Sequence, residues 1–238
     1  MGDESILAGR RVAALIPAAG SGRRLGGAVA KPYVPLGGRE ILARTLEVFE
    51  RCTVVHEVWV VVAAEQCDYC QRALVERYGL RKVRGLVVGG AERQESVWQG
   101  LQRIAPSVDL VVVHDGVRPF VTAALICQTL QRAAQHGAAI TAVPLTDTLK
   151  RVSEAGQVET TLPRKRLWRT QTPQAFRHDL LREAFQHAQR HGLVATDEAG
   201  LIEALGHPVY VVPGAEYNVK ITTRNDLRLG ESLLRSLD

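Results

Sequence analysis

A glycine-rich loop that carries several cations follows the first apolar run of the chain. It reads Pro-Ala-Ala-Gly-Ser-Gly-Arg-Arg-Leu over residues 17–25, and Lys31 follows shortly after it. Small residues let consecutive backbone N–H groups approach phosphate oxygens, and arginine and lysine add positive charge. The loop is not a P-loop, because Arg23 stands where that motif has lysine, and it is not a dinucleotide fingerprint, because Leu25 replaces the third glycine. We therefore predict a phosphate-binding loop of another kind.

Two further polar motifs begin where apolar runs end. Residues 89–97 read Gly-Gly-Ala-Glu-Arg-Gln-Glu-Ser-Val, in which the glycines permit close contact with a flat ligand and Ser96 can exchange a hydrogen bond near a helix start. Residues 114–119 read His-Asp-Gly-Val-Arg-Pro. An acid just past a buried parallel strand suits Mg²⁺ on a triphosphate, although alone it could equally cap a helix. In company with the other motifs we interpret Asp115 as a ligand-site residue and His114 as a hydrogen-bonded structural residue.

Positive charge gathers again in the second half of the chain. Residues 164–169 hold four cations around a tryptophan, and residues 171–174 read Gln-Thr-Pro-Gln. Such a cluster could be a nucleic-acid patch or could serve an anionic small molecule. Lys220 stands in the segment Asn-Val-Lys-Ile-Thr after a later apolar run. By itself it is interpreted as a solvated lysine on a short edge strand.

Strand-length apolar runs alternate with stretches of helical period along the chain. We predict strands over residues 12–16, 58–62, 86–88, 110–113, 139–143 and 209–212. Helices are predicted over residues 41–51, 67–78, 93–104, 122–136, 179–191, 197–205 and 224–237. Continuous apolar strands alternating with helices predict an α/β fold with a doubly wound, mostly parallel sheet covered on both faces. In such a sheet ligands bind at the carboxyl ends of the strands, where the motifs above begin.

The alternating pattern breaks between residues 147 and 174. Two polar strands are predicted there, over 149–152 and 158–162, with a turn at 154–157. Both are too hydrophilic for the interior of the sheet, so we predict a β-hairpin arm that projects from the domain. An isolated two-stranded hairpin is marginally stable in water and usually packs on something. Because the sequence holds no repeat or flexible linker, we expect a single domain over residues 1–238 with this arm.

Composition and charge exclude several classes of protein. Of 238 residues, 46% are hydrophobic and 23% are charged, which fits a soluble protein rather than a disordered or fibrous one. The net charge of +5 suits an anionic small molecule at least as well as nucleic acid, and the aromatic content of 5% argues against a base-stacking platform. No apolar run has the length of a transmembrane helix, and residues 1–6 lack the basic start of a secretory signal. Four cysteines make no disulfide framework, and Cys67 and Cys70 lie in a helical stretch without a second pair, so we expect helix-surface thiols in a cytoplasmic protein.

Taken together, the motifs closely resemble those of the 2-C-methyl-D-erythritol 4-phosphate cytidylyltransferase family of the non-mevalonate isoprenoid pathway. The family's pattern is P-A-A-G-x-G-x-R, a lysine, G-G-x-x-R-x-x-S-V, H-D-x-x-R-P, D-T-x-K, R-x-x-L-W-x-x-Q-T-P-Q, T-D-E and N-x-K-x-T. This chain carries it in order at residues 17–24, 31, 89–97, 114–119, 147–150, 164–174, 196–198 and 218–222. The ordered set spans almost the whole chain and is far more specific than any one motif. One departure is local, since Lys31 lies in Ala-Lys-Pro where the family usually has Pro-Lys-Gln. We expect no fused cyclodiphosphate synthase domain, which some relatives carry.

The resemblance implies a Rossmann-like nucleotidyltransferase fold and a site for CTP, Mg²⁺ and methylerythritol phosphate. The CTP phosphates would contact the residues Ala18, Ala19, Gly20, Arg24 and Lys31, and Arg24 and Lys31 would stabilise charge at the α-phosphorus. Gly90 and Ser96 would read the cytosine, and Asp115 would bind Mg²⁺ and substrate. The acceptor would be held by Thr148, Arg164, Thr196 and Lys220, with Arg118 nearby. The resemblance also implies a homodimer in which arms are exchanged, so that Arg164 acts in the partner's site.

The chemistry follows from the two substrates. The attacking group is already an anionic phosphate oxygen, so no general base is needed, and positioning with Mg²⁺, arginine and lysine electrostatics can overcome the repulsion between anions. One alternative is a ribitol-5-phosphate cytidylyltransferase, which shares the fold and the CTP motifs. A second is a nucleotide- or nucleic-acid-binding protein without catalysis that uses the basic arm. The presence of both Lys31 and Lys220 argues against the second, because a mere binder has no use for cations on opposite sides of a reacting phosphorus.

Overall fold

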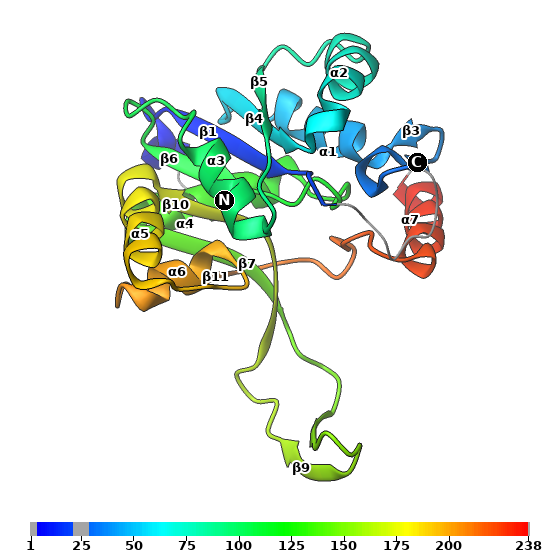
Figure 1. Cartoon of the computed structure of the whole chain (residues 1–238), viewed down its shortest axis with the longest axis vertical. Helices are drawn as coiled ribbons and strands as arrows, with labels where there is room; N and C mark the ends of the chain where they lie inside the picture. The colour runs from blue at the N-terminus through cyan, green and yellow to red at the C-terminus, as the bar shows by residue number, and fades with distance from the viewer. Residues whose placement is uncertain (1–3, 21–28, 238) are drawn as a thin grey trace.

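The computed structural model describes residues 4–20 and 29–237. Within this part of the chain the centre is a seven-stranded sheet of order β11-β7-β10-β6-β1-β4-β5 (Figure 1). Its strands are β1 (Val12–Pro17), β4 (Glu57–Val62), β5 (Val83–Val88), β6 (Leu110–Val113), β7 (Ala138–Pro144), β10 (Trp168–Arg177) and β11 (Tyr210–Pro213). All of these are parallel to one another except β10, which runs antiparallel to both β6 and β7. The predicted α/β fold with a mostly parallel sheet is confirmed.

Helices cover both faces of the sheet. On one face lie α1 (Ile41–Arg51), α4 (Ala123–His136) and the pair formed by α2 (Cys67–Tyr69) and the π-helix η5 (Cys70–Glu76), packed on Ala14 and Ile16. On the other lie α3 (Arg93–Leu101), α5 (His178–His191) and α6 (Glu198–Ala204), packed on Ala13 and Leu15. Alternate residues of a strand point to opposite faces. The continuous apolar run of β1 therefore fills two cores at once.

A smaller apolar cluster lies beyond the carboxyl end of the sheet. Helix α7 (Arg224–Leu237) packs on the short hairpin of β2 (Pro35–Leu36) and β3 (Arg39–Glu40), with Val117 and Ile221 in the same cluster. Short 3-10 helices lie at η1 (Glu4–Leu7), η3 (Lys31–Tyr33) and η4 (Ala64–Gln66). This cluster holds α7 and Ile221, which lies in the segment between β11 and α7, against the β2–β3 hairpin and Val117.

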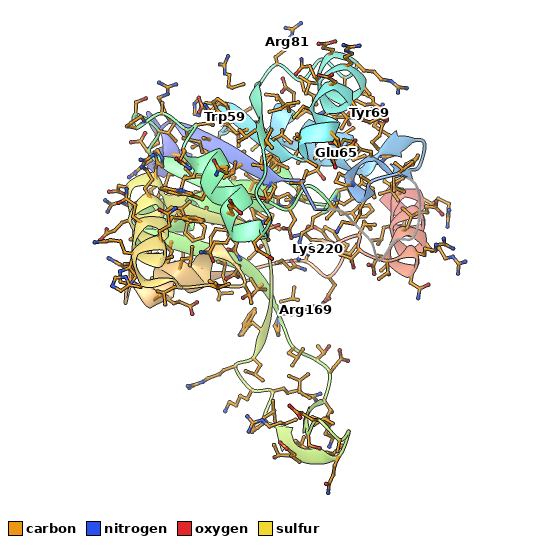
Figure 2. The ribbon with its side chains drawn as sticks, viewed as in Figure 1. Trp59, Glu65, Tyr69, Arg81, Arg169 and Lys220 are labelled. Carbon is orange, nitrogen blue, oxygen red and sulfur yellow. The ribbon has the colours of Figure 1, made fainter. Side chains whose placement is uncertain are left out.

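The two strands of the predicted hairpin arm are present with the predicted bounds. Strands β8 (Leu149–Val152) and β9 (Val158–Leu162) pair antiparallel in a sheet of their own. Figure 1 shows this hairpin projecting away from the body of the molecule. The strands that lead to it are β7 and β10, and Arg169 marks the place where β10 leaves the body (Figure 2).

Three expectations from the sequence are wrong. The break in the alternating pattern, expected to run to residue 174, contains most of β10, a ten-residue strand whose buried positions include Gln171, Thr172 and Gln174. Lys220 lies on irregular backbone rather than on a short strand. Cys70 is fully buried rather than exposed on a helix surface, although all four cysteines are free thiols.

Among the described residues, none of the helices combines the length and the apolar character that crossing a membrane requires.

Candidate active site

A cavity of about 350 Å³ opens at the carboxyl ends of β1, β5 and β6. Parallel strands of a doubly wound sheet bring their carboxyl ends to one edge, which is why these loops meet there. Residues predicted for the site that line the cavity are Ala18, Ala19, Gly20, Lys31, Gly90, Asp115 and Lys220. The predicted nucleotide and acceptor groups are therefore brought together from four distant parts of the chain.

The turn after β5 comes very close to the loop after β1. A Cβ atom added to Gly89 would lie 2.6 Å from the Cβ of Ala19 and 2.8 Å from Oγ of Ser96, so glycine is required for this approach. Ser96 is buried, and its Oγ accepts a hydrogen bond from the backbone N–H of Gly90 at 3.1 Å. The serine thereby fixes the shape of the turn that forms one wall of the cavity.

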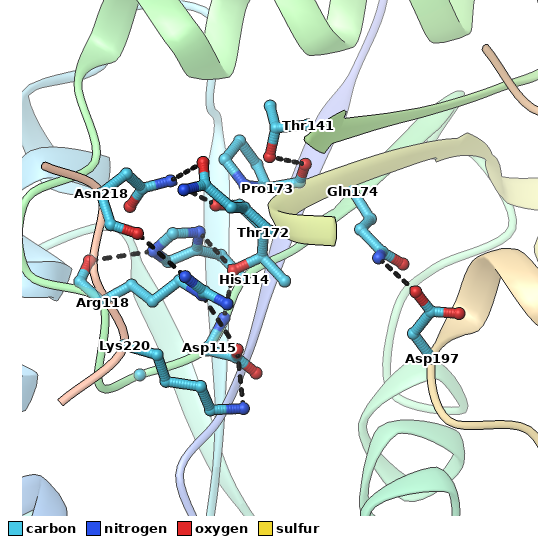
Figure 3. Close-up of polar contacts among 12 residues, drawn as sticks. His114, Asp115, Arg118, Thr141, Thr172, Pro173, Gln174, Asp197, Asn218 and Lys220 are labelled. Carbon is cyan, nitrogen blue, oxygen red and sulfur yellow. Dashed lines mark hydrogen bonds and ion pairs between the residues drawn. The ribbon is translucent and has the colours of Figure 1, made fainter. Parts of the chain in front are cut away.

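Asp115 lies at the centre of a cluster of cations (Figure 3). Lys220 Nζ lies 2.9 Å from its Oδ2, and Arg118 Nε donates to the same oxygen at 3.2 Å. Arg93 Nε lies 3.6 Å from Oδ1. Burial alone would raise the pKa of Asp115, but Lys220, Arg93 and Arg118 together outweigh burial and hold this pKa well below its ordinary value. The carboxylate is ionised, and the cluster around it keeps an excess of positive charge that suits an anionic ligand.

Backbone contacts fix the irregular segment that carries Lys220. Ile221 is fully buried and donates its N–H to the carbonyl of Val117 at 2.9 Å. Arg118 Nη1 donates to the carbonyl of Asn218, also at 2.9 Å. Lys220 is held between these two anchors at the cavity wall. Its interpretation as a solvated edge lysine is therefore wrong.

His114 belongs to a buried chain of hydrogen bonds behind Asp115. Its Nε2 contacts the carbonyl of Arg118 at 3.1 Å, and its Nδ1 contacts Oγ1 of Thr172 at 3.0 Å. A carbonyl can only accept, so Nε2–H donates and Nδ1 accepts from the hydroxyl, which itself accepts from the backbone N–H of Asp115 at 3.1 Å. Burial lowers the pKa of His114 to about 4, so the ring is neutral. The interpretation as a hydrogen-bonded structural residue agrees with this geometry.

A buried ion pair joins α3 to α6 beside Asp115. Arg93 Nη1 donates to Oε1 of Glu198 at 2.6 Å, and Nη2 donates to Oε2 at 3.0 Å. The side chain of Glu198 is 1% exposed. The segment before Glu198 is tied to β10, because Gln174 Nε2 donates to Oδ2 of Asp197 at 2.8 Å, and Asp197 also caps α6 through the N–H of Gly200.

Five predicted site residues among those described do not line the cavity, and one of them is Ser96, which is buried behind Gly90. Thr148 and Arg164 are exposed on the arm, and Arg164 Nη1 donates to the carbonyl of Thr146 there. Thr196 is exposed just before the cap of α6. Arg118 reaches the site through its contact with Asp115. A further predicted residue, Arg24, lies outside the described residues.

Sequence reasoning assigned no role to four residues that the structure brings to the site. These are Arg93, Thr172, Gln174 and Glu198. Each stands inside one of the motifs that the sequence singled out, so the motifs contained the signal. What the sequence could not give is the pairing between motifs, since the contact between Arg93 and Glu198 joins residues far apart in the chain.

The donor chemistry of the site bears on Mg²⁺. Among the described residues no group of three or more His, Cys, Asp and Glu side chains could hold a metal ion. Oδ2 of Asp115 is engaged by Lys220 and Arg118, whereas Oδ1 has one longer contact, with Arg93. Mg²⁺ usually keeps several waters and binds through one or two carboxylates together with substrate phosphates. Oδ1 therefore fits as one ligand of an ion that arrives on a triphosphate.

Comparison with known proteins gives one consistent result. The family profile described as "IspD: 2-C-methyl-D-erythritol 4-phosphate cytidylyltransferase" matches residues 12–236. The chain is 45% identical over 230 residues to the protein of that name from Geotalea uraniireducens, covering 96% of this chain and 98% of the relative. It is 46% identical over 227 residues to the one from Geobacter metallireducens, covering 94% and 97%. The solved structure of 4-diphosphocytidyl-2C-methyl-D-erythritol synthase from Anaerococcus prevotii superposes with a TM-score of 0.85 at 31% identity, covering 97% of this chain and 99% of the other.

Proposed function

The chain belongs to the 2-C-methyl-D-erythritol 4-phosphate cytidylyltransferase family, and we propose that its cavity transfers CMP from CTP to methylerythritol phosphate. The products are 4-diphosphocytidyl-2-C-methyl-D-erythritol and pyrophosphate, and the reaction belongs to isoprenoid precursor biosynthesis. The observation that carries this assignment is the cluster of Lys220, Arg118 and Arg93 around Asp115, in the same cavity as the loop after β1. An enzyme that joins two phosphorylated substrates needs this excess of positive charge at one place.

The reaction is an in-line displacement at the α-phosphorus of CTP. An oxygen of the acceptor phosphate forms the new P–O bond, and the bond between the α-phosphorus and the bridging oxygen breaks as pyrophosphate leaves. The attacking oxygen is already anionic, which agrees with a site whose buried histidine is neutral and fully engaged. The residues bind, orient and neutralise the two substrates rather than move a proton.

The two ends of the cavity suit the two substrates. The loop of Ala18, Ala19 and Gly20, with Gly90 opposite, would hold the nucleotide, and Lys31 would lie at its phosphates. Lys220 and Arg118 would hold the acceptor on the Asp115 side. Cations at both ends would screen the approach of one phosphate to another and would stabilise the charge that grows on the leaving group.

We propose that Mg²⁺ enters with CTP and that Asp115 Oδ1 supplies a protein ligand to it. When bound, the ion would neutralise charge on the triphosphate. The support is the donor set of the cavity, in which the ionised carboxylate of Asp115, with one lightly engaged oxygen, stands beside the predicted phosphate loop.

We propose further that the protein is a homodimer that exchanges arms, with the arm at about 147–174 on a single domain. Arg164 and Thr148 are assigned to the acceptor, yet in one chain both are exposed on the projecting hairpin. The arm also exposes apolar side chains, Val152 at 49% and Val158 at 55%. Packing against a second chain would bury these groups and would hold Arg164 firmly enough for phosphate recognition.

The four free thiols suit a reducing compartment, and we place the protein in the cytoplasm.

The test is turnover with defined acceptors. Purified protein with CTP and Mg²⁺ should release pyrophosphate when methylerythritol phosphate is added and far less when ribitol 5-phosphate replaces it. Replacing CTP by UTP or ATP should lower the rate. Turnover with ribitol 5-phosphate alone would overturn the proposed acceptor, and binding of CTP without turnover of any acceptor would overturn the proposed catalysis.

A further inference from the structure

Arg93 and Glu198 form an ion pair beside Asp115, and neither residue has been assigned to a substrate. Arg93 lines the cavity, whereas the carboxylate of Glu198 is almost fully buried behind it. Replacing a buried ion pair by apolar residues of similar volume is often neutral or stabilising, so such a pair is weak evidence of a role in stability alone. Because the pair lies directly beside the carboxylate of Asp115, a role in the site explains it better.

The geometry restricts what Arg93 can do. Both of its terminal nitrogens donate to Glu198, at 2.6 and 3.0 Å. Its Nε lies 3.6 Å from Oδ1 of Asp115. A guanidinium held by a bidentate carboxylate has a fixed plane and cannot turn to follow a substrate phosphate. The contact with Glu198 therefore holds the guanidinium with its Nε toward Asp115.

Hydrogen bonds to β10 and α3 fix the loop that carries Glu198. Glu198 begins α6, and the preceding Asp197 is held by Gln174 of β10 at 2.8 Å. On the other side, Gln94 of α3 accepts from the N–H of Ala195 at 2.9 Å. The loop before α6 is thus tied to both β10 and α3, and the position of Glu198 is set by the sheet.

Different cations contact the two oxygens of the Asp115 carboxylate. Lys220 and Arg118 hold Oδ2, and Arg93 is the remaining charged contact, at Oδ1. Among the residues that the structure describes, Arg93 is the charged side chain in contact with Oδ1, and it therefore helps to set the angle of that oxygen. We propose that Glu198 and Arg93 form a positioning pair that sets the orientation of the Asp115 carboxylate toward the polyol phosphate acceptor. This inference rests on the proposed function, in which Lys220 and Arg118 hold the acceptor beside Asp115.

The experiment compares Glu198→Gln with the wild type. The amide keeps the shape of the side chain but removes the charge that clamps Arg93. The apparent KM for methylerythritol phosphate should rise about tenfold, the size of one lost charge-assisted contact. The KM for CTP, measured at saturating Mg²⁺ because Asp115 Oδ1 is also the proposed Mg²⁺ ligand, should stay within about twofold. Arg93→Lys keeps the positive charge but cannot reach both carboxylates, so it should show the same split and should not rescue binding. If Glu198→Gln fails to fold, Arg93→Lys carries the test.

The matched control is Glu47→Gln, because Arg39 Nη1 contacts both oxygens of Glu47 at 2.6 and 2.8 Å in a pair outside the cavity. Its KM values should not move. A double-mutant cycle with Asp115→Asn supplies the decisive readout, with acceptor affinity measured by calorimetry in the presence of a non-hydrolysable CTP analogue. If Arg93 acts through Asp115, Arg93→Lys should weaken acceptor binding no further in the Asp115→Asn background.

Two outcomes would overturn the inference: full additivity in the cycle, or an equal rise in KM for both substrates that follows the loss of thermal stability. Failure of the proposed function would appear separately, as absence of wild-type turnover with methylerythritol phosphate.

Discussion

Acidification should destabilise the fold through His114, and the size of the effect follows from its burial. The ring is fully buried, donates to the carbonyl of Arg118 and accepts from Thr172. Protonation of Nδ1 would therefore break the hydrogen bond from Thr172 and would bury a charge. Burial lowers the pKa of His114 to about 4 in the folded protein, against about 6.5 in an unfolded chain.

The sign of the pH dependence follows from these two pKa values. Above about pH 6.5 both states hold a neutral ring, and the full stability is present. Between about pH 6.5 and pH 4 the unfolded chain takes up a proton that the folded protein refuses, so stability falls as the pH falls. From about pH 7 to pH 5 the free energy of unfolding should drop by about 2 kcal/mol through this one group. Asp115 contributes little in this window, because its folded pKa is held well below its ordinary value and an unfolded aspartate takes up its proton only at about pH 4.

The assay is urea unfolding followed by circular dichroism at the two pH values, at fixed protein concentration. His114→Gln should be less stable at neutral pH, but its loss of stability on acidification should be about 2 kcal/mol smaller than in the wild type. His207→Gln, which changes an exposed histidine, is the matched control and should leave the difference unchanged. An equal pH dependence in His114→Gln and the wild type would refute the reasoning.

Three further predictions concern the reaction. Lys31→Ala should lower kcat about 10²-fold with little loss of CTP affinity, since charge that grows only in the transition state acts on the rate, and near-normal single-turnover rates would contradict it. Lys220→Ala should mainly raise the KM for the acceptor, and a rise confined to CTP would show that the two ends of the cavity are reversed. Refolding a mixture of Lys31→Ala and Arg164→Ala chains should restore activity in roughly a quarter of sites if arms are exchanged, whereas arms that act within their own chain would leave the mixture inactive.

Much of the fold could be predicted from the sequence because its signals are local. Helix α1 and strands β6, β8 and β9 have the predicted bounds, since each is a run of one periodicity between clear breaks. Strand β10 was missed because its buried half carries polar residues, which reads as a loop. Those residues are buried because Thr172 and Gln174 find partners on His114 and Asp197, and such long-range pairing leaves no trace in periodicity.

For the site too, local features could be predicted from the sequence and long-range contacts could not. The residue types of the cavity were predictable, because phosphate chemistry requires glycines and cations at strand ends. Lys220 was misjudged by itself, because its contact with Asp115 depends on irregular backbone anchored by Ile221. When a residue lies on irregular backbone, as Lys220 does, the sequence can identify its chemical group but not the residue that it contacts.

Strand β10 links the cavity to the arm. Its register with β7 shifts between Thr170 and Gln174, and in this irregular stretch Thr172 turns its hydroxyl to His114 and to the backbone of Asp115. Its outer end, from Trp168, leads into the arm that carries Arg164. One strand is thus fixed to the centre of the cavity and continuous with the proposed dimerisation arm. If arms are exchanged as proposed, the strand that carries each arm is also the strand whose Thr172 accepts from the backbone N–H of Asp115, so the proposed dimer contact and the site share one structural element.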